Sequence, residues 1–337
     1  MENIIQLIIK LTFLPGIGPM TVRKYLQITD RSDWGSYQSL RETNISAIRD
    51  CFTAISERKW LELSERANEE ISITRNSNVR ILSFEDPSYP VNLKVLKNFP
   101  LLLYVKGNIE CLNESKTVAV IGTRHPTPFG EKMGRRISYQ LAEDGYVIVG
   151  GLAVGIDSCG HQGALEAHGK TVAILAAGLN MPVYPKINRR LANEIIEQGG
   201  ALVSTYANGV RLRPQFLAAR DEWQSGMSDG VIAVETGIKG GTNIAIHHSF
   251  TQKRPLGVLD HSAFFDENHL AEVTQAQGNK RYLCEKKACA INNSESLREF
   301  EQKMMVQRKK RLDQFKNDLS RTSMRKQYSS SKQIDLF

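Results

Sequence analysis

Two kinds of hydrophobic pattern divide the chain. Up to about residue 70, apolar residues recur at helical spacing, at 4–9 and again at 45–55. From residue 116, short β-branched runs alternate with segments that carry apolar residues every three or four positions. Strands that are apolar on both faces and joined by helices are typical of a doubly wound, mainly parallel α/β sheet. The sequence therefore predicts a small helical region followed by such a sheet.

The predicted strands are 117–121, 146–149, 171–176, 201–204, 231–235 and 255–259. Helices are predicted near 158–168, 189–198, 217–227 and 242–252, and an earlier one carries Phe129, Met133, Ile137 and Leu141 on one face. A bridging segment before them contains a turn cluster at 86–90 and a further strand at 100–105. We expect three domains, at 1–70, 71–290 and 291–337.

Charge is concentrated at the C-terminus. The chain carries a net charge of +8, and residues 301–337, with ten Lys/Arg and four Asp/Glu, account for +6 of it. A basic tail on a nearly neutral body favours an anionic polymer as partner, although a solvated tail explains the charge equally well. We expect a charged helix from Glu295 to about Leu319, with Phe300, Met304 and Met305 as packing residues, and disorder from Ser320 onward.

Several classes of protein are excluded by composition. The five cysteines are scattered without a CxxC pair, so neither a disulfide framework nor a zinc site is expected, and a cytoplasmic location fits. His161 and His168 are two helical turns apart, and His247 and His248 face different ways, so no metal site is expected. No run approaches the ~20 apolar residues of a membrane span. The apolar N-terminus lacks the basic lead of a signal peptide and is interpreted as a helix.

The segment 14–19, Leu-Pro-Gly-Ile-Gly-Pro, separates two helical patterns near the N-terminus. A glycine turn before the helix expected at 21–26 would leave backbone N–H groups free, as an anion site does. The pattern resembles the hairpin of a helix-hairpin-helix DNA-binding module. An ordinary turn between two helices remains the alternative.

The carboxyl ends of the predicted strands carry the candidate site, because ligands of open α/β sheets collect there. Three turns are rich in glycine or carry a cation, and each precedes a helix, so their backbone N–H groups would face one phosphate-binding groove. The candidate residues are Gly122, Thr123 and Arg124; Gly150, Gly151 and Gly155; and Gly240, Gly241 and Thr242. Asp157 is interpreted as a helix N-cap rather than a catalytic acid.

Two nucleotide-binding motifs are excluded. The loop at 150–155 reads G-G-x-x-x-G instead of the dinucleotide pattern G-x-G-x-x-G, and the next strand ends at 176–178 without an acidic residue for a ribose. Five residues separate Gly163 from Gly169-Lys170-Thr171, whereas a P-loop has four, and this segment runs from helix to strand. No cofactor is therefore expected.

The segment RLRPQFLAAR at 211–220 favours a polymeric ligand. Arg211, Arg213 and Arg220 interleave with Phe216, a combination in which cations follow phosphates and a ring stacks on a base of single-stranded nucleic acid. The alternative, that Phe216 is a core residue and the arginines are ordinary surface charges, carries equal weight on this segment alone.

Several long segments together resemble the DNA-processing protein A (DprA, or Smf) family. They are DPSYPVNLKVLKNFPLLLYVKGN, VAVIGTRHPTPFG, GGLAVGIDSCGHQGAL, GKTVAILAAGLNMPVYPKIN, RPQFLAAR and GGTNIAI, in this order over about 86–260. The resemblance implies a Rossmann-like domain that binds single-stranded DNA as a dimer and hands it to the RecA recombinase without catalytic turnover. It places DNA contacts on Gly122–Arg124, the glycines at 150–151, the pair Arg213 and Phe216, and Arg220.

The chain departs from the family pattern in three places. After the position of Arg220 the family usually continues Arg-Asn-Arg-Ile, whereas this chain has Asp221-Glu222-Trp223. Carboxylates there repel phosphate, so the affinity or the ligand is altered. Residues 239–243 read KGGTN in place of a serine-glycine-serine run, and the tail has no winged-helix pattern.

The last five residues are Gln333, Ile334, Asp335, Leu336 and Phe337. They resemble the pentapeptide with which bacterial replication and repair proteins bind the sliding clamp. Leu336 and Phe337 would enter an apolar pocket while Gln333 bonds at its rim. A chance match, or a tail that docks on its own domain, is the alternative.

Three functions follow from these patterns. The first is a cytoplasmic, non-enzymatic single-stranded-DNA-binding protein that partners RecA and the clamp. The second is a sensor or hydrolase of free nucleotides, in which Glu235 acts on a glycosidic bond. The third is an adaptor that tethers partners through its tail.

Overall fold

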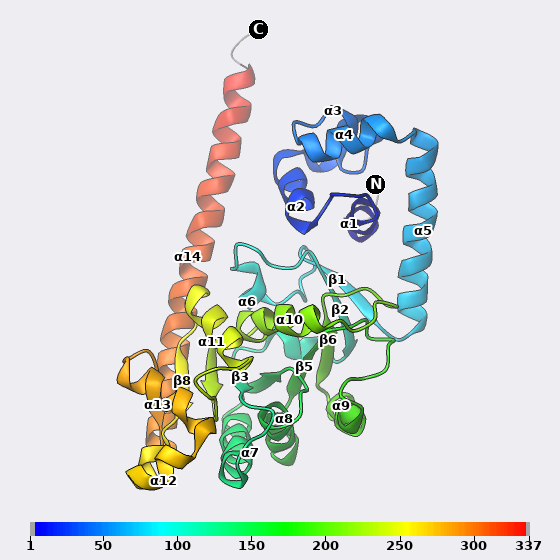
Figure 1. The fold of residues 1–337 in the computed structure, drawn as a ribbon. Helices are drawn as coiled ribbons and strands as arrows, with labels where there is room; N and C mark the ends of the chain where they lie inside the picture. Colours follow the sequence, from blue (N-terminus) through cyan, green and yellow to red (C-terminus); the bar gives the residue numbers. More distant parts are fainter. Residues whose placement is uncertain (1–3, 335–337) are drawn as a thin grey trace.

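A nine-stranded, mostly parallel sheet forms the centre of the molecule in the computed structural model, which describes residues 4–334 (Figure 1). Its order is β1-β2-β6-β5-β4-β3-β7-β8-β9, and only the pairs β1–β2 and β2–β6 are antiparallel. Over these residues the strands are β1 (Arg80–Ser83), β2 (Leu102–Gly107), β3 (Thr117–Ile121), β4 (Val147–Gly150), β5 (Thr171–Leu175), β6 (Ala201–Ser204), β7 (Gly230–Ala233), β8 (Leu256–Leu259) and β9 (Cys289–Ile291).

Helices precede the sheet and then alternate with its strands. They are α1 (Ile4–Thr12), α2 (Pro19–Ile28), α3 (Tyr37–Glu42), α4 (Ser46–Ala54), α5 (Glu57–Asn76), α6 (Val91–Lys94), α7 (Pro128–Glu143), α8 (Ile156–Glu166), α9 (Arg189–Glu197), α10 (Pro214–Gly226), α11 (Thr242–Thr251), α12 (Glu267–Glu272), α13 (Gln277–Cys284) and α14 (Ser294–Ile334). The predicted doubly wound α/β fold is confirmed. The sequence patterns missed β1 and β9, which are short edge strands.

Two hydrophobic layers cover the sheet. On one face Val118 and Val120 of β3 pack with Ile137 and Leu141 of α7 and with Phe300 of α14. On the other face, alternate strand residues such as Ala119 and Ile121 pack with residues of α6, α11 and α13. The alternation explains why each strand reads as a continuous apolar run, since both of its faces are buried.

The strand order reverses at β3. The chain runs from β3 through β4 and β5 to β6 on one side, then returns to β7, β8 and β9 on the other side. A crevice therefore opens between the turns that follow β3 and β7, the place where open α/β sheets bind ligands.

The N-terminal helices form a cluster above the β1–β2 end of the sheet (Figure 1). The segment 14–18 makes the turn between α1 and α2, and the backbone of Gly16 has φ +77° there. Gly18 caps α2 without a side-chain hydrogen bond. Arg23 is buried and donates to the carbonyl oxygens of Lys97 and Phe99, which ties α2 to the segment before β2.

The long helix α14 lies against the β8–β9 end of the sheet and then extends past the body (Figure 1). Phe300 and Met304 are buried, as the sequence predicted, and Met305 is half-buried. The helix continues to Ile334, well beyond the end predicted at Leu319, and includes the polar segment after Ser320 that the sequence pattern assigned to disorder.

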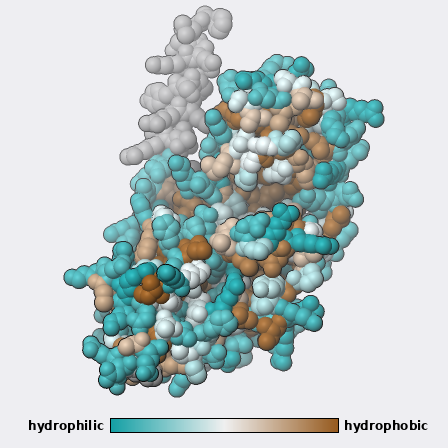
Figure 2. All heavy atoms as spheres, in the orientation of Figure 1, coloured by the Kyte–Doolittle hydropathy of each residue, from teal (hydrophilic) through white to brown (hydrophobic). Residues whose placement is uncertain are grey.

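The surface drawn in Figure 2 is mostly hydrophilic, with hydrophobic residues in scattered patches. Among the described residues, no helix combines the length and apolar character needed to cross a membrane.

Candidate nucleic-acid interface

A cleft of about 370 Å³ lies at the switch point between β3 and β7. The turn after β3 contributes Gly122, Thr123 and Arg124, and the turn after β7 contributes residues 239–242. The loop after β4 contributes Ala153. The turns after β3 and β7 thus meet the loop after β4 at one cavity of a size that suits a nucleotide, but the predicted Gly150, Gly151 and Gly155 do not line it.

Hydrogen bonds to the buried Glu235 fix the turn after β3. The amide of Thr123 donates to the carbonyl oxygen of Glu235 at 2.8 Å, and the amide and hydroxyl of Thr127 donate to its carboxylate at 2.8 and 2.6 Å. The side chain of Glu235 is fully buried and is not part of the cleft lining. Glu235 therefore fixes this turn, while Arg124 is exposed at its tip.

The loop after β4 is arranged differently from the expectation. Gly155, with φ +82°, is the N-cap of α8, and Asp157 lies in its first turn. The Asp157 carboxylate accepts from the amides of Gly151 and Ala153 at 3.0 and 3.4 Å. Asp157 is therefore not an N-cap. The amides of Gly151 and Ala153 are not free to bind phosphate, because both donate to the Asp157 carboxylate.

Free amides occur instead at the start of α11. Gly241 is the N-cap and makes no side-chain cap hydrogen bond. Within the described part of the chain, the amides of Gly240, Gly241 and Thr242 make no hydrogen bond. A helix N-terminus with unpaired N–H groups attracts anions, and Arg124 and Lys239 line the same cleft.

Arg220 has a largely structural position. Only 4% of it is exposed, and its Nη1 donates to the carbonyl oxygens of Gly151 and Ile174 while Nε donates to Asp221. A Cβ on Gly151 would collide with this guanidinium, so the glycine is needed for its approach. Gly150 likewise leaves room for the buried His161, whose pKa burial lowers to about 3. Arg220 lines the cleft with part of its side chain, but two of its nitrogens are already engaged.

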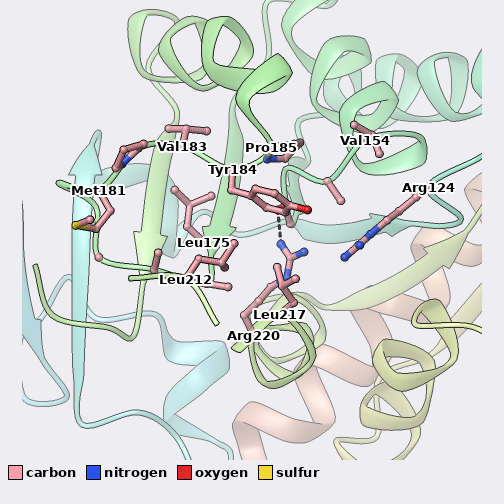
Figure 3. A pocket seen from close by; sticks show the side chains of 16 residues that line it. Arg124, Val154, Leu175, Met181, Val183, Tyr184, Pro185, Leu212, Leu217 and Arg220 are labelled. Atoms are coloured by element: carbon pink, nitrogen blue, oxygen red, sulfur yellow. Dashed lines mark hydrogen bonds between the residues drawn. The ribbon is translucent and has the colours of Figure 1, made fainter. Parts of the chain in front are cut away.

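A smaller, mainly apolar pocket adjoins the cleft and shares Arg124, Ala153 and Arg220 with it (Figure 3). Leu175, Leu212 and Met181 lie on one side, and the Tyr184 ring lies near the two arginines. The sequence reasoning did not find Tyr184, which is 53% exposed. It follows a strand end by nine residues, so no short-range pattern connects it with the site.

Arg211, Arg213 and Phe216 line neither cavity, although Leu212 of the same segment lines the smaller pocket. Arg211 and Arg213 are exposed, and the Arg213 guanidinium lies 5.7 Å from the centre of the Phe216 ring. Phe216 is half-buried and stacks on Tyr206, with 4.2 Å between ring centres. The segment thus presents cations and an aromatic pair at the surface, separate from the turns of the cleft.

Two carboxylates line the cleft and repel a phosphate, whereas the cations that line it attract one. Asp157 and Asp221 both line it, and burial raises the pKa of each, to about 6 for Asp221. The nearby Arg220 and Arg124 act in the opposite direction on both groups. The cleft therefore has a basic rim and an acidic floor. Among the described residues, no cluster of metal-ligating side chains occurs.

Comparisons with known proteins agree with this architecture. Residues 80–301 match the family model of DNA recombination-mediator protein A. Protein Smf of Escherichia coli is 34% identical over 54% of this chain and 48% of its own length, and DprA of Bacillus subtilis is 28% identical over 56% and 63%. The matched part thus spans about half to two thirds of these relatives.

Two solved structures extend the comparison. DprA of Streptococcus pneumoniae superposes with a TM-score of 0.68 at 24% identity, over 87% of this chain and 95% of its own. DNA processing protein A of Helicobacter pylori, described for its single-stranded DNA binding mode, gives 0.57 at 26% identity over 68% and 98%. The family model covers more than half of the chain, so this protein belongs to the DNA recombination-mediator protein A (DprA/Smf) family.

Proposed function

We propose that this protein binds single-stranded DNA through the cleft at the β3–β7 switch point, without catalytic turnover. The convergence of Arg124, Lys239 and the free amides of 240–242 on one cavity carries the proposal. The exposed Arg213 and the Phe216–Tyr206 stack would extend the path of the strand along the surface. The basic α14 adds affinity that does not depend on sequence.

The Arg124→Ala variant tests the cleft. We expect about a tenfold loss of affinity for oligo-dT and a shallower dependence on salt, because one phosphate contact disappears. Fluorescence anisotropy across a salt series measures both. Arg58→Ala, which removes a 90% exposed arginine from α5, is the control and should bind as wild type. Equal binding by Arg124→Ala and wild type at ~150 mM salt would contradict the proposal.

The carboxylate of Asp221 predicts a pH dependence. Its pKa is raised to about 6 by burial, with the nearby Asp157 adding to the shift and Arg220 and Arg124 opposing it. Above pH 6 the group is charged and repels phosphate, so affinity for oligo-dT should rise as pH falls from 7.5 to 5.5. Asp221→Asn should bind more tightly at pH 7.5 and show a flatter profile. A steeper profile in this variant would contradict the assignment.

A free-nucleotide sensor or hydrolase is the second candidate. Two observations favour a nucleotide in the cleft: its volume, and the carboxylates on its floor. Against hydrolysis by Glu235 stands the position of this residue, buried beneath the turn and bonded to Thr127. Calorimetry with mononucleotides and with an oligo-dT series separates the candidates, because affinity that grows with strand length indicates a polymer.

We also propose that the bound strand is passed to a RecA-type recombinase and that the protein acts as a homodimer. The family's description as a recombination mediator supports the first proposal. Strand-exchange assays with RecA, with and without this protein, test it. Light scattering over a concentration series tests the dimer.

The C-terminal pentapeptide supports a further proposal, that the protein is tethered to the bacterial sliding clamp. Gln333 and Ile334 belong to the end of α14, while Asp335, Leu336 and Phe337 lie outside the described residues. Deletion of 333–337 should abolish retention of the protein on immobilised clamp and leave oligo-dT affinity unchanged. The adaptor hypothesis instead predicts that binding through the tail is the main activity. A variant that has lost DNA binding in the cleft but keeps its biological function would support it.

A further inference from the structure

The acidic floor of the cleft contains polar atoms that make no hydrogen bond to the part of the chain that the structure describes. Only 3% of Gln224 in α10 is exposed, and this residue lines the cleft. Its Nε2 donates to Asp221 at 2.7 Å, but its Oε1 is buried and has no hydrogen-bond partner among residues 4–334. A buried acceptor without a donor is costly, and such atoms in native structures call for an explanation.

Asp221 presents a second acceptor beside Gln224. Its Oδ1 accepts both from Arg220 at 2.9 Å and from Gln224, whereas its Oδ2 makes no hydrogen bond within the described chain. The side chain is 17% exposed, so this oxygen can reach a molecule in the cleft. The neighbouring Asp157 already accepts from two loop amides. The floor therefore offers acceptors, while the rim, with Arg124, Lys239 and the start of α11, offers donors and positive charge.

We infer that Gln224 and Asp221 form a specificity site that accepts hydrogen bonds from a nucleotide whose phosphate lies on the cationic rim. The ligand class is a nucleotide unit that presents a neutral donor about one sugar or base away from its phosphate. An exocyclic amine of a base and a terminal sugar hydroxyl supply the same chemistry. This inference rests on the proposed function, since it names what the same cleft distinguishes.

The physical basis is the asymmetry of hydrogen-bond energetics. A ligand that supplies a donor removes the cost of the unpaired Gln224 oxygen, whereas a ligand without one leaves that oxygen buried and unpaired. A purely electrostatic groove for phosphates would discriminate little between bases. The inferred site therefore predicts a preference among strands of equal length and charge.

The experiment compares oligonucleotides of about 15 nucleotides by fluorescence anisotropy. One arm sets oligo-dC, whose exocyclic amine is the only donor on the base, against the same strand built from N4,N4-dimethyl-dC, which keeps the length and charge but has no base donor. The other sets oligo-dT ending in a 3′-hydroxyl against the same strand ending in a 3′-deoxy sugar. We expect about a three- to tenfold preference for the donor-bearing strand in one arm, and that arm identifies the source. Absence of preference in both arms overturns the inference.

Gln224→Met tests the residue itself, because methionine keeps the length of the side chain and removes the acceptor. The preference should fall to about one while affinity for the donor-free strand stays within about twofold. Gln252→Met is the matched control, since this half-buried glutamine bonds to Ser225 and Glu222 and does not line the cleft. Should Gln224→Met fail to fold, Asp221→Asn must reduce the same preference, because an amide then points at the donor.

The outcomes separate this inference from the proposed function. Wild-type protein that binds every strand equally well, with affinity that grows with length, retains the proposed function and loses the specificity site. Wild-type protein that binds no single-stranded DNA loses both. A preference that survives unchanged in Gln224→Met and in Asp221→Asn also overturns the inference.

Discussion

Asp229→Asn should destabilise the protein by about 3–5 kcal/mol, the cost of removing one partner from a buried ion pair. The Asp229 carboxylate is fully buried, and the residue immediately precedes β7. Two arginines of α14, Arg308 and Arg311, donate to this carboxylate at about 3.0 Å. Asn92 of α6 also donates to it, as do the amide and the hydroxyl of Thr117 at the start of β3. One charge thus joins α14 to the two central strands.

Urea denaturation followed by circular dichroism measures this effect. The Asn side chain keeps the volume but leaves two cations, each with about a tenth of its side chain exposed, without their counter-ion. Glu194→Gln is the control, because its partner Arg190 is 90% exposed and such a pair contributes about 0–1 kcal/mol. A loss below ~1 kcal/mol for Asp229→Asn would show that α14 is held mainly by Phe300 and Met304.

The central strands could be predicted from the sequence because burial on both faces leaves an uninterrupted apolar run. The structure has β3 and β6 at the predicted bounds, and α9 within one residue of them. Edge strands leave a weaker signal: β1 has an exposed Arg80 at its start, and β9 contains only three residues. The continuation of α14 past Ser320 was also missed. A polar composition indicates that a segment is exposed to solvent, but it does not indicate whether the backbone of that segment is helical.

The candidate site could be predicted only in its positions along the chain. Strand ends and glycine turns indicated the cleft, since parallel strands bring their carboxyl ends to one edge. The sequence could not predict which backbone amides and arginine nitrogens are already hydrogen-bonded, because this depends on how the loops and turns contact other parts of the chain. The bond from Arg220 to the carbonyl oxygen of Gly151 joins residues 69 positions apart, which one-dimensional patterns do not connect. The bond from the Gly151 amide to Asp157, six positions later, depends on the fold of the loop between them. For the same reason the unpaired oxygen of Gln224 becomes visible only in the fold.

Gly155→Ala should reduce affinity for oligo-dT by more than about tenfold and lower stability by about 1–3 kcal/mol. Gly155 has φ +82° and ψ −133°, a conformation that residues with a Cβ rarely adopt. An added Cβ would also collide with the carbonyl oxygen of Thr123 and come within 2.8 Å of the backbone of Arg124. The methyl group must therefore push apart the loop after β4 and the turn that carries Arg124.

Gly199→Ala separates the two parts of this effect. Gly199 has φ +79°, but an added Cβ there would meet no atom within 4 Å, and the residue follows α9, away from the cleft. This variant should show the backbone cost alone, about 1 kcal/mol in urea denaturation, with unchanged oligo-dT binding. If Gly155→Ala is folded and binds as tightly as Gly199→Ala, the spacing between the two turns does not determine binding, and the strand must lie along the Phe216 surface instead of in the cleft.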